Sequence, residues 1–191
     1  MRVLLVAEGK HELDGALEAL VKRIVPTDPV CTTDFVSCNE IHAHHGKGQG
    51  YFKKAVRWLL TAEDRDYDAL VLLIDQDGHP ERDKEIAEAQ QSKLGVSRRA
   101  LGVAIRMFDA WILADETALS EALERKIERQ PNPEKLKNPK EDCKRLLEGS
   151  EVSMSPAELY RSVCRIAKIH VLRERCPRGF GPFAERLQSL E

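Results

Sequence analysis

Four carboxylates follow two short apolar runs of the chain and could together bind a metal ion. Glu8 and Glu12 come after the run VLLVA, and Asp75 and Asp77 come after the run LVLLI. Runs of Val, Leu and Ile without polar alternation are typical of strands buried on both faces of a parallel sheet. In such sheets the functional crevice lies beyond the carboxyl ends of the strands. We therefore expect these acids to share one crevice, where a hard divalent cation would offset their repulsion.

The spacing within each pair indicates how the side chains are directed. Asp75 and Asp77 are two residues apart, which on an extended strand end points both side chains to the same face. Glu8 and Glu12 are four apart and would face one direction over the first turn of a helix, with Gly9 allowing the backbone to turn. Such a cluster suits Mg²⁺ or Mn²⁺, which can polarise a phosphodiester or generate hydroxide. The alternative is structural, because Asp-x-Asp-Gly is a common turn sequence and Glu at a helix start favours the helix dipole.

The first half of the chain alternates between strand and helix patterns, which predicts the elements that position these acids. Right-handed βαβ crossovers and a mostly parallel α/β sheet flanked by helices follow from this alternation. We expect strands at residues 3–7, 34–38, 69–74 and 103–107, and helices at 13–24, 52–60 and 83–94.

The second half of the chain predicts helices only. Asp115 has the character of a helix N-cap, and the segment SPAE at 155–158 is a capping box with proline at the first helical position. A last short helix is expected after Pro182. We therefore predict an α/β core over residues 1–114 and a helical extension over 115–191 packed on it.

Composition sets limits on partners and location. The 30 basic residues nearly balance the 32 acidic ones, so any nucleic-acid surface must be local. The five cysteines are scattered and form no CxxC, which fits reduced thiols better than a disulfide framework. The N-terminal apolar run is too short for a signal-peptide core or a membrane span. These observations predict a cytoplasmic protein.

Two segments resemble a known family of catalytic domains. AEGKHELD resembles the strand-to-helix glutamate motif of Toprim domains, and LLIDQDG resembles their DxD motif. The spacing of Glu8 and Glu12 is similar to that in the Toprim domains of overcoming-lysogenization-defect (OLD) nucleases. The segment IRMFDAWILAD also resembles a poorly characterised bacterial Toprim-like family, in which glutamate is commoner at the position of Asp109. The resemblance covers about the first 110 residues and implies a Toprim-like (Rossmann-like) sheet for them.

The resemblance implies roles for five acids and a reaction. Glu8 would be a metal ligand and a general acid or base, and Asp75 and Asp77 would be the principal ligands of Mg²⁺ or Mn²⁺. Glu12 and Asp109 would complete the site or serve a second metal ion. The implied activity is a metal-dependent nuclease acting on DNA or RNA. The same resemblance implies a role in defence against phage or other mobile DNA, with a separate ATPase as partner.

A glycine-rich, basic stretch could carry the phosphate backbone past the metal crevice. Its core is HAHHGKGQG at residues 42–50, whose glycines permit close backbone approach. The residues that we expect to contact nucleic acid are Lys10, His45, Lys47, Lys53 and Lys54. The alternative is a polar loop followed by a solvated helix face. Zinc binding by Cys38, His42, His44 and His45 is a further alternative, but their spacing matches no standard zinc site.

Two other functions compete with the nuclease hypothesis. A haloacid-dehalogenase-like phosphatase would use Asp75 as nucleophile and Asp77 as acid and base, but this leaves Glu8 and Glu12 unexplained and places His79 where threonine is usual. The other alternative is a non-catalytic Toprim-like subunit of an ATPase complex.

Overall fold

The computed structural model describes residues 1–36 and 50–190. The chain forms an α/β fold with a four-stranded, all-parallel sheet in the order β2-β1-β3-β4. The strands are β1 (Arg2–Ala7), β2 (Val30–Phe35), β3 (Ala69–Asp75) and β4 (Arg98–Ala104). The predicted fold class, a parallel α/β sheet flanked by helices, is therefore confirmed. Parallel pairing places the carboxyl ends of all four strands at one edge of the sheet.

The two strands with the strongest apolar runs lie where the sequence predicts them. β1 and β3 are adjacent and buried along almost their whole length, as expected for central strands covered on both faces. The two outer strands begin earlier than predicted. β2 starts at Val30 instead of 34, and most of its side chains are exposed or half-buried because it is an edge strand. Its threonines and Asp34 carry little of the hydrophobic pattern that marks a buried strand.

The strand predicted at 103–107 lies at Arg98–Ala104, and two arginines explain the error. Arg99 is buried, and its guanidinium donates to the carbonyls of Ser92 and Val96 at 2.8 and 2.5 Å. These hydrogen bonds let a charged residue be buried near the start of β4. Arg106 adopts φ 66° and turns the chain, so the apolar residues after Ala104 do not continue the strand.

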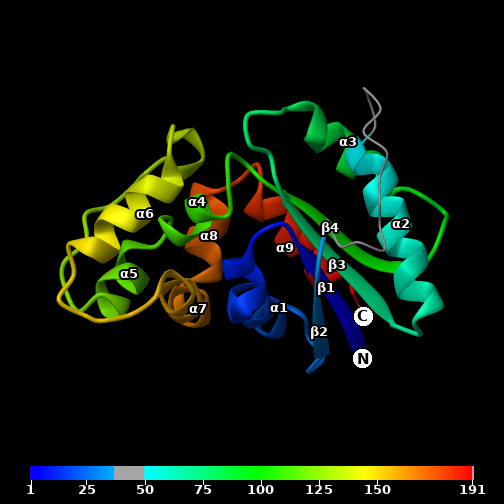
Figure 1. The fold of residues 1–191 in the computed structure, drawn as a ribbon, viewed down its shortest axis with the longest axis horizontal. Helices are drawn as coiled ribbons and strands as arrows, with labels where there is room; N and C mark the ends of the chain where they lie inside the picture. Colours follow the sequence, from blue (N-terminus) through cyan, green and yellow to red (C-terminus); the bar gives the residue numbers. More distant parts are fainter. Residues whose placement is uncertain (37–49, 191) are drawn as a thin grey trace.

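Helices α2 (Gly50–Asp64) and α3 (Glu81–Gln90) cover one face of the sheet (Figure 1). Their apolar sides meet alternate residues of the strands, such as Leu4, Leu72 and Leu101. Trp58 of α2 is fully buried in this cluster, and its Nε1 donates to the carbonyl of Val36 at 3.2 Å.

The opposite face is covered by helices from both halves of the chain. It includes η1 (Glu12–Ala16), a π-helical turn, then α1 (Leu17–Ile24), α4 (Asp109–Ile112) and α9 (Phe180–Gln188). Trp111 of α4 is fully buried here and stacks edge-on against Phe180 at 5.1 Å between ring centroids. The remaining elements pack against this layer: α5 (Glu116–Ala122), η2 (Pro133–Lys135), α6 (Pro139–Glu148), α7 (Pro156–Ile166) and α8 (Ile169–Arg175).

Both predicted helix starts are confirmed. Asp115 caps α5 by accepting from the amides of Thr117 and Ala118 at 3.0 and 3.2 Å. Ser155 and Glu158 form the capping box of α7. The last helix begins at Phe180, so Pro182 lies in its first turn and not before it. The division at residue 114 stays a prediction, and the helices after it share one hydrophobic cluster with β1, β3 and β4.

Among the described residues, no helix is both long and apolar enough to cross a membrane.

Gly102 of β4 lets α9 pack closely against the sheet, and a substitution at this position tests that packing. A Cβ built on Gly102 would lie 2.4 Å from Cδ2 of Phe183 in α9. Gly102→Ala should therefore lower the free energy of unfolding by about 1–3 kcal/mol, the usual cost of overpacking. Thermal unfolding should show a lower melting temperature, by about 2–4 °C for each kcal/mol.

Gly50→Ala is the matched control, because a Cβ at Gly50 would meet no described residue within 4 Å. It should leave stability unchanged or slightly increased. Equal effects of the two substitutions would contradict the packing of α9 on β4.

Candidate metal centre

Asp75 is the residue on which the other acidic side chains converge. It ends β3, and its Oδ1 accepts from the amide of Phe108, just before α4, at 2.8 Å. Its own amide donates to Oε2 of Glu8 at 2.9 Å, and its carbonyl accepts from Nη1 of Arg82 at 2.6 Å. Asp75 therefore joins the ends of β1 and β3 to α3 and to the turn after β4.

Glu8 lies in the turn that follows β1 and is held by a tyrosine. Its Oε1 accepts from the hydroxyl of Tyr51 at 2.5 Å, and its Oε2 lies 4.0 Å from Nη1 of Arg82. The ring of Tyr51 is itself in contact with two cations, with Arg82 Cζ at 4.5 Å and Lys54 Nζ at 4.7 Å from its centroid. Burial and the hydrogen bond to Glu8 raise the pKa of Tyr51, so the hydroxyl stays a donor. These contacts fix the direction of the Glu8 carboxylate.

Glu12 is buried, and its carboxylate lies directly over Gly9. It is 7% exposed, and a Cβ added to Gly9 would lie 1.9 Å from its Oε2. A residue larger than glycine at position 9 would therefore displace this carboxylate. Gly9 is needed here for close approach.

Asp109 enters the same region from the start of α4. It is 6% exposed, and its Oδ1 accepts a short hydrogen bond from the hydroxyl of Tyr160 in α7. Its carbonyl accepts from Sγ of Cys143 in α6 at 3.6 Å. Two helices of the C-terminal half thus complete the surroundings of this acid.

Glu8, Glu12, Asp75 and Asp109 form what we name the carboxylate cluster, because their charges act on one another. Burial, with the charges of Asp109 and Glu8, raises the pKa of Glu12 to about 7. Burial, with the charge of Glu12 next in strength, raises the pKa of Asp75 to about 8. Perturbed carboxyl groups that converge from separate segments are typical of functional sites. A cation bound among them would reverse both shifts, since it favours the ionised forms.

The four carboxylates are suitable ligands for a hard cation, but in the described residues they do not have the arrangement of a metal site. All donors are carboxylate oxygens, the ligands that Mg²⁺ and Mn²⁺ prefer. Within residues 1–36 and 50–190, no group of three or more His, Cys, Asp or Glu side chains has the arrangement of a metal site. Several of the oxygens already accept hydrogen bonds, from Tyr51, Tyr160 and the amide of Phe108. Metal binding would therefore require carboxylates to exchange these donors for the cation.

Asp77 stands apart from the predicted pairing with Asp75. The strand ends at Asp75, and Asp77 adopts φ 49° in the turn that follows, so the alternation of an extended strand does not reach it. Its amide donates to the carbonyl of Arg106 at 2.9 Å. With Arg106, Lys137 and Lys140 it lines a hollow of about 490 Å³ beyond the ends of β3 and β4.

The predicted nucleic-acid contacts are only partly within the described residues. Lys10 and Lys53 are exposed, and Lys54 contacts the Tyr51 ring that holds Glu8. His45 and Lys47 lie outside the described residues. The alternative zinc ligands, Cys38, His42, His44 and His45, lie outside them too.

Four residues of the site have no signal in the sequence. Tyr51, Arg82 and Tyr160 contact the acids from distant positions, and the charge of Lys140 acts on Glu12. Tyr51 and Tyr160 lie on amphipathic helices, where an aromatic residue usually belongs to the core. Only the three-dimensional contact distinguishes them.

The raised pKa values predict how stability depends on pH. Folding raises the pKa of Asp75 from 3.8 to about 8 and that of Glu12 from 4.5 to about 7. Between about pH 4 and pH 8 the folded chain therefore binds more protons than the unfolded chain, and its stability should fall as pH rises. In metal-free buffer, Asp75→Asn should weaken this dependence and raise the melting temperature at pH 8.5 by several degrees. The substitution keeps an oxygen that can accept from Phe108.

Melting curves of the two proteins at pH 5.5 and pH 8.5, with a chelator present, measure this effect. Asp64→Asn, at the exposed end of α2, is the control and should behave as wild type. The raised pKa of Asp75 is refuted if wild type and Asp75→Asn lose stability equally between the two pH values.

Comparison with known proteins places the chain in a family. Residues 8–188 match a family described as a domain of unknown function, DUF4276. No curated protein and no solved structure matches the chain. The matched range begins at Glu8, directly after β1, and includes the whole carboxylate cluster, strands β2, β3 and β4 and the helices through α9. The chain therefore belongs to the DUF4276 family.

Proposed function

We propose that the protein is a metal-dependent nuclease that hydrolyses phosphodiesters at the carboxylate cluster. The observation that carries this proposal is the convergence of Glu8, Glu12, Asp75 and Asp109 from three segments, with raised pKa values for Glu12 and Asp75. Acids that are removed from water and repel one another cost stability, and carboxyl groups with perturbed pKa values cluster at functional sites. The resemblance of the segments around Glu8 and Asp75 to Toprim motifs supports the same reaction class.

Each residue of the site has a role in this proposal. Glu8, Glu12 and Asp75 would hold Mg²⁺ or Mn²⁺, and Asp109 would complete the site or serve a second ion. The bound metal would supply charge to polarise the phosphodiester and to activate water. Tyr51 orients Glu8 through its hydroxyl, which leaves Glu8 suited to accept or return a proton near the reacting phosphate.

Basic residues beside the cluster support a phosphate-bearing substrate. Arg106, Lys137 and Lys140 line the hollow next to Asp77, and none of them forms an ion pair within the described residues. Unpaired cations near buried carboxylates can hold phosphate oxygens and offset negative charge. Lys140 already acts on Glu12, which links the hollow to the cluster.

The phosphatase alternative has less support. That mechanism assigns no role to Glu8 and Glu12, although the charges of both act on Asp75. Asp77, the acid and base of that mechanism, lines a hollow with the turn after β4, and Asp75 is not among the residues that line it.

We extend the proposal to biology on the resemblance to OLD nucleases alone. The protein would act in the cytoplasm in defence against phage or other mobile DNA, with a separate ATPase as partner.

Metal binding and cleavage test the proposal directly. Calorimetric titration with Mg²⁺ and Mn²⁺ should show binding to wild type, weakened at least about 10–100-fold in Asp75→Asn and Glu12→Gln. Cleavage of plasmid DNA, linear DNA and RNA should require the metal and be lost in both variants. The same titration and cleavage assays on Asp77→Asn test whether Asp77 acts with the cluster.

Asp64→Asn is the matched control and should bind metal and cleave as wild type does. Metal binding without cleavage would favour the non-catalytic subunit. Absence of metal binding, or cleavage that survives both substitutions, would overturn the proposal.

A further inference from the structure

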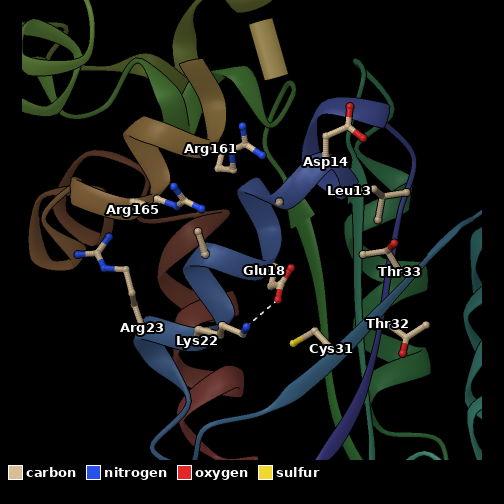
Figure 2. Close-up of a pocket in the computed structure, with 12 residues that line it drawn as sticks. Leu13, Asp14, Glu18, Lys22, Arg23, Cys31, Thr32, Thr33, Arg161 and Arg165 are labelled. Carbon is tan, nitrogen blue, oxygen red and sulfur yellow. Dashed lines mark ion pairs between the residues drawn. The ribbon is translucent and has the colours of Figure 1, made fainter. Parts of the chain in front are cut away.

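A basic groove lies on the face of α1 that the core does not use. The groove has a volume of about 750 Å³, with residues of α7 on one side of α1 and residues of β2 on the other. Figure 2 shows Arg161 and Arg165 of α7 directed toward it, and Thr32 and Thr33 of β2 across α1 from them. We name these lining residues, with Lys22 and Arg23 of α1, the basic groove.

The charges of the basic groove are unbalanced. Lys22 pairs with Glu18 at 2.8 Å, so its charge is compensated. Arg161 and Arg165 are one helical turn apart, and neither forms an ion pair within the described residues. Like charges at this spacing on a helix repel each other, and a bound anion would relieve that repulsion. Guanidinium groups bind phosphate oxygens through paired hydrogen bonds.

Arg23 fixes the geometry of the groove and is not available to a ligand. Its Nη1 donates to the carbonyl of Cys164 and its Nη2 to the carbonyl of Ala167, both at 2.7 Å. These carbonyls belong to the end of α7, so Arg23 ties α7 to α1. The positions of Arg161 and Arg165 relative to α1 are thereby set before any ligand binds.

The basic groove adjoins the carboxylate cluster at two places in the chain. Glu12 belongs to the cluster, and Asp14 and Gly15 line the groove. Tyr160 donates to Asp109, and the next residue, Arg161, lines the groove. A Cβ at Gly15 would lie 3.0 Å from Cδ of Arg161, so the arginine passes close to the backbone just after Glu12.

An exposed aromatic residue extends the groove toward the cluster. Phe35 ends β2, is 47% exposed, and pairs in register with Ala7, the residue before Glu8. Strand alternation puts Phe35 on the same face as Thr33, which lines the groove. An exposed ring beside a basic groove is the arrangement on which single-stranded nucleic acids stack their bases.

We propose that the basic groove binds a single strand of nucleic acid and leads it to the carboxylate cluster. This inference rests on the proposed function and names its substrate class. Arg161 and Arg165 would contact neighbouring phosphates, and Phe35 would stack on a base. The volume of the groove, about 750 Å³, falls in the range of small-ligand pockets, about 300–1,000 Å³, and suits a short stretch of one strand.

Binding measured without metal separates this inference from the proposed catalysis. Fluorescence anisotropy with labelled single-stranded DNA and RNA, in a chelator and over a range of salt concentrations, gives the affinity and its salt dependence. Arg161→Gln/Arg165→Gln should weaken binding and reduce the slope of log K against log salt by about 1.4, or about 0.7 for each lost phosphate contact. Phe35→Ala should weaken binding about 5–150-fold with the slope unchanged.

Arg98→Gln/Arg129→Gln removes two exposed arginines elsewhere and is the matched control. It should bind as wild type does, and melting curves should show that all variants are folded. Equal binding by wild type and the groove variant would overturn this inference and leave the proposed function standing. Binding of duplex as tight as that of single strands, or no binding at all, would also overturn it. The calorimetric metal titration then tests the catalytic proposal independently of nucleic-acid binding.

Discussion

The hydrogen bonds around Asp75 constrain the whole carboxyl edge of the sheet. Its amide, its carbonyl and its side chain each bond a different segment: Glu8 after β1, Arg82 in α3, and Phe108 before α4. Since the strands are parallel, these segments all emerge at the same edge, and one residue can tie them together. The same arrangement half-buries Asp75, so a residue whose carboxyl group has a raised pKa ties the edge together.

The helices after β4 belong to the site as much as to the core. α7 supplies Tyr160 to Asp109 and the two arginines of the basic groove, while α6 places Lys140 near Glu12. In the described part of the chain, the helical second half therefore forms one wall of the site, which agrees with a family match that runs through both halves.

The sequence predicts what depends on local pattern and misses what depends on distant partners. The apolar runs of β1 and β3 and the caps at Asp115 and Ser155 carry their own signals, and all four appear in the structure. The strand at β4 is predicted too late because a charged residue, Arg99, lies near its start and breaks the apolar pattern, although nearby carbonyls of Ser92 and Val96 accept its hydrogen bonds. Tyr51 is missed because its partner Glu8 is 43 residues away.

The two tryptophans lie on opposite faces of the sheet, so tryptophan fluorescence can report on each layer of helices. Trp58 of α2 is buried in the cluster on one face, and Trp111 of α4 is buried in the cluster on the other face. Trp58 donates a hydrogen bond, whereas Nε1 of Trp111 has no acceptor among the described residues. The two indoles therefore differ in environment, and single-tryptophan forms would report separately on the loosening of each face. Trp111 also touches Phe108, whose amide bonds Asp75, so its emission would register events at the edge where the acids meet.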